Sequence, residues 1–283
     1  MTTTSIIEST ATDVYRTLLV DTPPSTEVFA VDPAKEPAAA LVAALAGIDD
    51  PPTVRLLIAE EVLKWLRRDF HLASTAADLA DAGTLSIRTS EDAVANATLT
   101  TEESVLSLVS TDSYTAGLTT NDAEFVQSMR EQCSEAWGDA TMGDLRTPPR
   151  SRVYETLADE IGSDVEADYR VMLDAVGSTR SGGYGSIEDN ALDEVQLCIL
   201  AGAKGEVQLF ELSNWGEQVG LASKATFSRV KNRLEDHGLV ETEKVPVEIG
   251  RPRQRLVLSK QLRGYGASDL PVAVRAELQA APA

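Results

Sequence analysis

The sequence is poor in the residues that build disulfide frameworks and transition-metal sites. It contains two cysteines and two histidines in 283 residues. Cys133 and Cys198 lie far apart, and Cys198 falls within an apolar run, so we expect two buried free thiols rather than a disulfide. Neither His71 nor His237 has a Cys or His neighbour at the spacing of a metal site. The sequence therefore predicts no metal site.

Motifs of cofactor-dependent and hydrolytic enzymes are also missing. No Gly-x-Gly-x-x-Gly follows a predicted strand, and there is no P-loop. His71 and Asp78 have the outer spacing of the His-x-Lys-x4-Asp motif of phospholipase D enzymes, but Ala73 occupies the lysine position. We interpret that spacing as coincidence. The prediction is a chain that is not an enzyme and has no catalytic or cofactor-binding residues.

Long apolar runs are absent as well. No stretch of 18 apolar residues is available to span a membrane. The first residues, Met1 to Ser5, lack the basic start and apolar core of a signal peptide. We expect a cytoplasmic protein that does not contact a membrane.

Positive charge is scarce and unevenly placed. The chain has 25 Lys and Arg against 45 Asp and Glu, a net charge of −20, and only seven of the basic residues are lysine. Residues 191–265 hold 11 basic and 10 acidic side chains, whereas the remainder holds 14 and 35. Dense surface carboxylates keep a protein hydrated when molar salt screens their repulsion. This composition is typical of a halophilic protein, with an acidic mesophilic protein as the alternative.

The nearly neutral segment has the pattern of a winged helix-turn-helix. Its expected elements are a helix over Leu192–Ile199, a helix over Leu209–Val219, a helix from Ser223 to Leu234, and strands over Leu239–Val247 and Gln254–Leu258. Gly220 can adopt the left-handed conformation that ends the second helix. Ser223 is a favourable N-cap for the third helix, in which Phe227, Val230 and Leu234 form one apolar stripe.

The opposite face of that third helix is suited to DNA. There is no acidic residue from Gln218 to Leu234. Arginine pairs with guanine and asparagine with adenine, while flanking basic side chains suit phosphates. Arginines also occupy the turn between the two strands, where they would meet a backbone or a minor groove. The predicted DNA-binding residues are Ser223, Lys224, Ala225, Thr226, Ser228, Arg229, Lys231, Asn232, Arg233, Arg251, Arg253 and Arg255.

The remainder of the chain predicts an α/β domain with a mostly parallel sheet, helices on both sides and a hairpin at one side. Expected strands cover residues 27–32, 54–59, 85–88, 105–109 and 113–118, and expected helices cover 6–19, 38–45, 60–72, 74–82 and 123–137. The predicted domains are 1–140 (α/β effector or dimerisation domain), 141–190 (helical connector with helices at 152–161 and 165–176, then a flexible linker from 177), 191–265 (winged helix-turn-helix, α+β) and 266–283 (C-terminal helix and tail).

Two segments carry resemblances to known families. The block from Thr98 to Trp137 resembles the sensor domains of archaeal TrmB-type regulators, which have a phospholipase D-like fold without the catalytic residues. Most of the chain closely resembles the haloarchaeal TbsP family of transcriptional regulators, most clearly over Leu212–Arg229 and Thr242–Arg253. The resemblance implies a DNA-binding regulator whose recognition helix and wing lie in the C-terminal domain.

These observations predict a sequence-specific transcriptional regulator that binds promoter DNA in a haloarchaeon. Its partners would be double-stranded DNA and a second copy of the chain, with a small-molecule metabolite as an effector. The two helices at 152–176 are the first candidate for the dimer seam, because they show apolar stripes without an obvious core, and the α/β domain is the second. One alternative is an interaction protein whose winged helix docks on the basal transcription machinery. Another is an α/β enzyme with an accessory DNA module, which lacks a residue set for chemistry.

Overall fold

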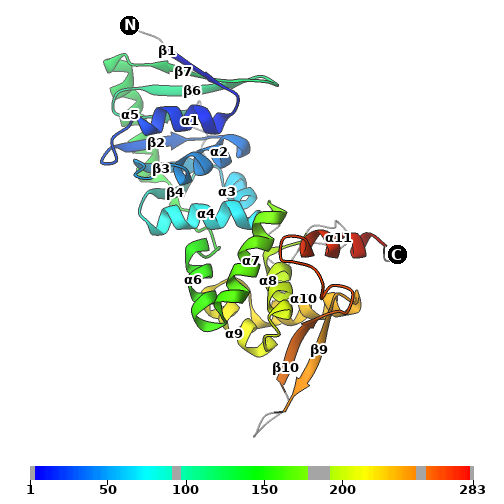
Figure 1. Ribbon diagram of the computed structural model, residues 1–283. Helices are drawn as coiled ribbons and strands as arrows, with labels where there is room; N and C mark the ends of the chain where they lie inside the picture. Colours follow the sequence, from blue (N-terminus) through cyan, green and yellow to red (C-terminus); the bar gives the residue numbers. More distant parts are fainter. Residues whose placement is uncertain (1–3, 91–96, 178–191, 247–252, 281–283) are drawn as a thin grey trace. The chain divides into compact units, whose positions relative to one another are not determined.

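The computed structural model describes residues 4–90, 97–177, 192–246 and 253–280. The chain divides into two compact units, coloured in sequence order in Figure 1. Unit 1 comprises residues 1–67 and 75–145, and unit 2 comprises residues 68–74 and 146–283. Each unit is described by itself below.

Unit 1 is built on an eight-stranded mixed sheet with the strand order β1-β7-β6-β5-β2-β3-β4-β8. The strands are β1 (Thr4–Glu8), β2 (Glu27–Val31), β3 (Thr53–Ile58), β4 (Leu85–Thr89), β5 (Thr98–Thr100), β6 (Val105–Ser110), β7 (Thr115–Thr120) and β8 (Thr141–Met142). The five strands predicted from the sequence are confirmed: the bounds of β2, β3, β4 and β6 differ by at most one residue, and those of β7 are shifted by two. The short β5 and β8 were not predicted, because two or three residues carry no periodicity.

The predicted fold class is confirmed, but the sheet is not mostly parallel. Only β2–β3 and β3–β4 pair in parallel, and the other five pairings are antiparallel. Strands β5, β6 and β7 follow one another through connections that are too short to hold the crossover required for parallel pairing. The predicted hairpin at one side is the β6–β7 pair.

Helices cover both faces of this sheet. They are α1 (Ala11–Val20), α2 (Lys35–Ala46), α3 (Glu60–Leu66), α4 (Phe70–Asp81), whose start is counted with unit 2, and α5 (Ala123–Asp139). On one face, Phe29, Val31 and Leu57 form a core with Cys133 and Trp137 of α5. On the other face, α1 packs against β1 and β7.

The N-terminal segment differs from its prediction. A single helix was expected from Ile6 to Leu19, but Thr4–Glu8 forms β1 and the helix begins at Ala11. Thr10 caps that helix, because its hydroxyl oxygen accepts a hydrogen bond from the Asp13 backbone N–H at 3.2 Å. The adjacent Ile6 and Ile7 therefore belong to a strand that ends before this cap. This strand, β1, pairs antiparallel with β7.

Unit 2 contains the winged helix-turn-helix. Its elements are α6 (Arg150–Glu160), α7 (Ser163–Val176), α8 (Glu194–Lys204), α9 (Leu209–Val219), α10 (Lys224–Asp236), β9 (Val240–Val245), β10 (Arg253–Leu258) and α11 (Leu270–Ala280). Helix α8 is buried on all sides from Glu194 to Ala203. A helix without a solvent face marks the centre of a core, and α7, α9, α10 and β10 surround α8.

Helices α6 and α7 join this core. The sequence analysis predicts a dimer seam from their apolar stripes, because the sequence shows no obvious core for them. In the structure Val153 and Leu157 of α6 and Tyr169 and Leu173 of α7 are buried together with residues of α8 and α10. The Trp215 indole N–H of α9 also donates to the Thr156 hydroxyl of α6 at 2.9 Å. The apolar stripes of α6 and α7 are therefore buried within the core of unit 2. The predicted flexible linker falls almost entirely on 178–191, outside the described residues.

Neither a membrane span nor a metal site is found in the described part of the chain. No helix there is long and apolar enough to cross a membrane. The same residues contain no group of three His, Cys, Asp or Glu side chains that could hold a metal ion.

Candidate nucleic-acid interface

The turn between α9 and α10 fixes the position of the candidate recognition helix. Gly220 ends α9 with φ 85°, in the left-handed region that glycine adopts without strain. The Leu221 backbone N–H then donates to the Gly216 carbonyl at 2.8 Å. Gly216 also lets the helices approach closely, because a Cβ atom there would lie 2.3 Å from the Phe227 ring. Two glycines therefore set the angle and the distance between α9 and α10.

The first turn of α10 is capped by side chains of the protein itself. The Ser223 hydroxyl accepts from the Thr226 backbone N–H at 3.2 Å, which confirms the predicted N-cap. The Glu217 carboxylate accepts from the Lys224 backbone N–H at 3.2 Å, and this hydrogen bond is the main reason that the pKa of Glu217 is lowered. The Lys224 ammonium also lies 3.3 Å from Glu217. This helix terminus is therefore occupied by a carboxylate and is not an open phosphate site.

Helix α10 shows the predicted division into a buried stripe and an exposed face. Phe227, Val230 and Leu234 are at most 1% exposed. The predicted DNA-binding side chains that are exposed are Ser223, Lys224, Ala225, Ser228, Arg229 and Asn232. Thr226 and Arg233 are half-buried beside them. The helix therefore presents a guanidinium, an amide and a hydroxyl on one surface, the groups that pair with base edges.

Lys231 does not belong to that surface. It is 5% exposed, and its ammonium lies 2.7 Å from a Glu235 carboxylate oxygen. The second oxygen of Glu235 accepts from the Thr242 hydroxyl of β9 at 2.7 Å. Lys231 thus helps to fasten α10 to the wing, and we leave it out of the proposed interface.

The wing is a two-stranded antiparallel ribbon of β9 and β10. Arg251 lies outside the described residues. Arg253 and Arg255 share one face of β10. Arg253 is directed toward α9, where its guanidinium lies 4.4 Å from the centre of the Phe210 ring and 3.8 Å from Glu211. Arg255 lies 4.0 Å from Glu206. Both arginines are partly exposed, so these are weak surface pairs that a phosphate can replace.

Three carboxylates therefore stand beside the basic groups that the sequence suggested for DNA. Glu217, Glu211 and Glu206 pair with Lys224, Arg253 and Arg255 respectively. The sequence analysis missed these pairings because it counted charges along the chain between Gln218 and Leu234. Lys244 was missed as well: it is exposed on the wing and, being opposite Gln254, lies on the other face from Arg253.

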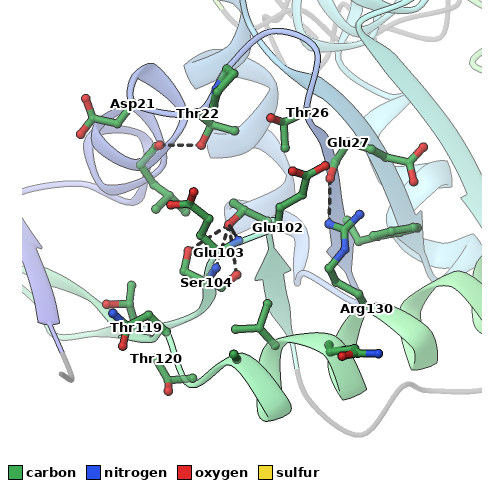
Figure 2. Close-up of a pocket in the computed structure, with 18 of the residues that line it drawn as sticks. Asp21, Thr22, Thr26, Glu27, Glu102, Glu103, Ser104, Thr119, Thr120 and Arg130 are labelled. Atoms are coloured by element: carbon green, nitrogen blue, oxygen red, sulfur yellow. Dashed lines mark hydrogen bonds between the residues drawn. The ribbon is translucent and has the colours of Figure 1, made fainter. Parts of the chain in front are cut away.

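Unit 1 contains a separate polar cleft, shown in Figure 2. Its volume is about 1280 Å³, and it lies between the end of α1, the start of β2, the β5–β6 turn and α5. Arg130 of α5 spans one side, where its Nη1 donates to the Glu27 carbonyl at 3.1 Å. Thr26 lines the cleft and is only 6% exposed.

Charge in this cleft is strongly one-sided. The lining contains one guanidinium, that of Arg130, and five carboxylates, those of Asp21, Glu27, Glu102, Glu103 and Glu131, of which the Glu27 carboxylate pairs with Arg55. Threonine and serine hydroxyls supply much of the remaining polar surface, and Phe29 and Val126 supply apolar surface. Such a lining repels phosphates and carboxylates and accepts hydrogen bonds from neutral or cationic groups.

Two family models match successive parts of the chain. The model for "Transcriptional regulator TbsP-like, N-terminal" matches residues 3–148. The model for "Transcriptional regulator TbsP-like, C-terminal HTH domain" matches residues 149–275. No curated protein matches the chain.

Solved structures show distant likenesses. One is the structure of TrmBL2, described as an archaeal chromatin protein with a novel mode of DNA binding. Its sequence identity to this chain is 18% and the TM-score is 0.35. The match includes 49% of this chain and 53% of the TrmBL2 chain, so it spans about half the length of that protein. Nuc of Salmonella typhimurium, a phospholipase D family member, is 16% identical with a TM-score of 0.32 and covers 50% of this chain and 98% of its own. NucT of Helicobacter pylori is 10% identical with a TM-score of 0.32 and covers 50% of this chain and 99% of its own.

Proposed function

Because the chain belongs to the family of TbsP-like transcriptional regulators, matched over both of its parts, we propose that it is a non-enzymatic regulator that binds promoter DNA sequence-specifically through α10 and the wing. The observation that carries this proposal is the exposed surface of α10. Ser228, Arg229 and Asn232 stand opposite the buried stripe of the same helix. In this arrangement they approach base edges when α10 enters a major groove.

Arg229→Ala tests the assignment of this surface. Its guanidinium would pair with one guanine, so its loss should cost about 1–3 kcal/mol of binding free energy and relax the preference at one base pair. The measurement is selection of duplexes from a random pool in molar KCl, followed by titration of the selected duplex and its single-base variants. The full chain is used throughout.

Arg170→Ala is the matched control for charge. Arg170 is exposed on α7, where it pairs with Glu166, outside α10 and the wing. The control should bind the selected duplex as the native chain does. If Arg229→Ala instead weakens binding to every duplex equally, Arg229 contacts a phosphate, and a different face of α10 reads the bases. If the native chain selects no duplex and shifts no genomic fragment, the winged helix docks on another protein.

The cleft of unit 1 is the proposed site for a small-molecule effector. Its volume is sufficient for a metabolite, and the largely buried Thr26 lines it with a hydroxyl group that can form a hydrogen bond with a ligand. The five carboxylates favour a neutral polyhydroxy compound or an amine over a phosphorylated metabolite. Melting temperatures in molar KCl should rise with compounds of the first two classes, and Thr26→Val should reduce the rise. An equal rise with a phosphorylated compound would contradict this charge argument.

The protein is proposed to act as a homodimer in a haloarchaeal cell. A single winged helix contacts few base pairs, whereas two of them select a pair of half-sites about one helical turn, ~10 bp, apart. The chain has 45 acidic and 25 basic residues, and this excess of acidic residues suits a cytoplasm that contains molar salt.

A further inference from the structure

An exposed apolar area lies on the sheet of unit 1. Ile7 of β1, Val109 of β6 and Leu118 of β7 are 63%, 51% and 47% exposed. The strand register places Ala116 between Ile7 and Val109, and Leu118 between Ser5 and Ser107. Side chains that oppose one another across strands share a face. The six residues form one continuous area, called the sheet patch: Ser5, Ile7, Ser107, Val109, Ala116 and Leu118.

The other face of the same strands is already filled by α1. A Cβ atom on Gly117 would lie 2.6 Å from Val14 of α1 and 2.8 Å from Leu106. Neighbouring residues of a strand point to opposite faces, so Ala116 and Leu118 point away from α1. The sheet patch is therefore the side of these strands that α1 does not cover.

The charge of these strands limits what can cover the patch. Strands β1, β6 and β7 contain 17 residues, of which only Glu8 is charged, in a chain that is 25% charged with a net charge of −20. They offer no cation to DNA or to an anionic membrane. An acidic surface of this or another protein would bring carboxylates against apolar side chains. The same patch on a second copy is equally apolar and uncharged.

We infer that two copies of this chain associate through their sheet patches, packed face to face about a twofold axis. A twofold contact requires a surface that is complementary to itself, and two uncharged sheet faces pack at a spacing of about 10 Å. Contact at this place keeps the carboxylates of both copies away from the interface. The inference rests on the proposed homodimer and is independent of DNA recognition.

Light scattering on the full chain in about 2 M KCl, where the screening length is below about 3 Å, tests the interface. The native chain should be a dimer, and Leu118→Glu and Ile7→Glu should each raise the dimer dissociation constant at least about tenfold, the loss expected for an unpaired charge in an apolar interface. Both side chains are about half exposed or more, so the variants should keep the native circular dichroism. Val272→Glu is the control, because Val272 is 62% exposed on α11 of unit 2.

A second measurement does not depend on destabilising the dimer. Both native cysteines are buried, so the thiol of Leu118→Cys is the one available for a short bis-maleimide. Leu118→Cys should cross-link into dimers, and Val272→Cys should not. A monomeric native chain, a dimer unaffected by both glutamate variants, or equal disruption by Val272→Glu would each overturn the inference. A native dimer that binds no duplex would leave the inference standing while contradicting the proposed function.

Discussion

At the scale of single residues, the helix-turn-helix depends on one close contact. Gly216 on α9 touches the ring of Phe227, which is fully buried in the stripe of α10. No side chain fits between them, and Phe227 cannot move aside because α8 and α9 pack around it. The contact explains how a short turn brings the buried faces of two helices together.

Gly216→Ala should therefore lower the free energy of unfolding by about 1–3 kcal/mol, the usual cost of overpacking a core. The added methyl would overlap the Phe227 ring, which lies 2.3 Å from the ideal Cβ position. Chemical denaturation in molar KCl measures the change. Gly264→Ala is the matched control: it has no atom within 4 Å of a new Cβ, so it should stay within about 0.5 kcal/mol of the native chain. Equal stabilities for both variants would contradict the contact.

The two thiols are a second feature of single residues. Cys133 packs between α5 and the sheet, and Cys198 lies inside α8. Burial raises the pKa of both thiols above their ordinary value, so less thiolate, the reactive form, is present at a given pH. The sequence analysis expected two buried free thiols, and the structure confirms this.

Neither thiol should react with iodoacetamide at pH 8 while the chain is folded. Mass spectrometry after alkylation should find no modified cysteine in molar KCl, and two modified cysteines after unfolding in guanidinium chloride. Rapid alkylation of one cysteine in the folded chain would show that its helix opens to solvent.

At the scale of elements, the wing is held against α9 by its own arginines. Arg253 stacks on Phe210 and pairs with Glu211, while Arg255 pairs with Glu206. These pairs orient the ribbon before DNA arrives, and they also compete with phosphate for the same guanidinium groups. Because these ion pairs are partly exposed and weak, DNA phosphates can displace the carboxylates from the arginines.

The double variant in which alanine replaces both Arg253 and Arg255 should bind all duplexes more weakly, and to the same extent. Loss of two phosphate contacts should reduce the slope of log affinity against log salt by about 1–2. Lys244→Ala removes a charge from the opposite face of the same ribbon and should have a smaller effect. Glu211→Gln should strengthen binding, because it removes a carboxylate that pairs with Arg253. Titrations at several KCl concentrations measure all four chains, and an unchanged slope in the double variant would exclude the wing contacts.

At the scale of the whole molecule, the net charge of −20 dominates behaviour in solution. Residues outside 191–265 carry 35 acidic and 14 basic side chains, so their carboxylates repel one another and repel DNA at low ionic strength. The screening length falls from about 30 Å at 0.01 M to about 3 Å at 1 M salt. Molar salt therefore reduces repulsion within each chain and between the chain and DNA.

Folding and DNA binding should both require high salt. Counterion release weakens phosphate contacts as salt rises, but few basic groups are available here to make such contacts. The affinity for the selected duplex should stay flat or increase between about 0.5 and 2 M KCl, the range in which screening is strong. Helical circular dichroism should disappear on dialysis into dilute buffer. A chain that remains folded in dilute buffer and binds DNA best there would contradict the halophilic interpretation.

Local sequence determined the recognition helix and the ribbon that follows it. The helical spacing of Phe227, Val230 and Leu234, the Ser223 cap and the Gly220 stop all act within a few residues, so periodicity and capping are sufficient to place α10 and its exposed face. The same is true of β9 and β10, which are neighbours in the chain. Fold class was also predictable, because alternating helices and strands indicate an α/β domain.

Only the tertiary structure decided which side chains remain available to a partner. Lys231 is buried against Glu235, and three further basic groups lie beside carboxylates. The stripes of α6 and α7 lie inside unit 2, whereas Ile7 and Leu118 lie exposed on the sheet of unit 1. These outcomes depend on contacts between segments that are distant in sequence, and helix or strand periodicity contains no information about which segments meet. The strand order of the sheet followed the same rule, because the β1–β7, β2–β5 and β4–β8 pairings join strands that are far apart in the chain.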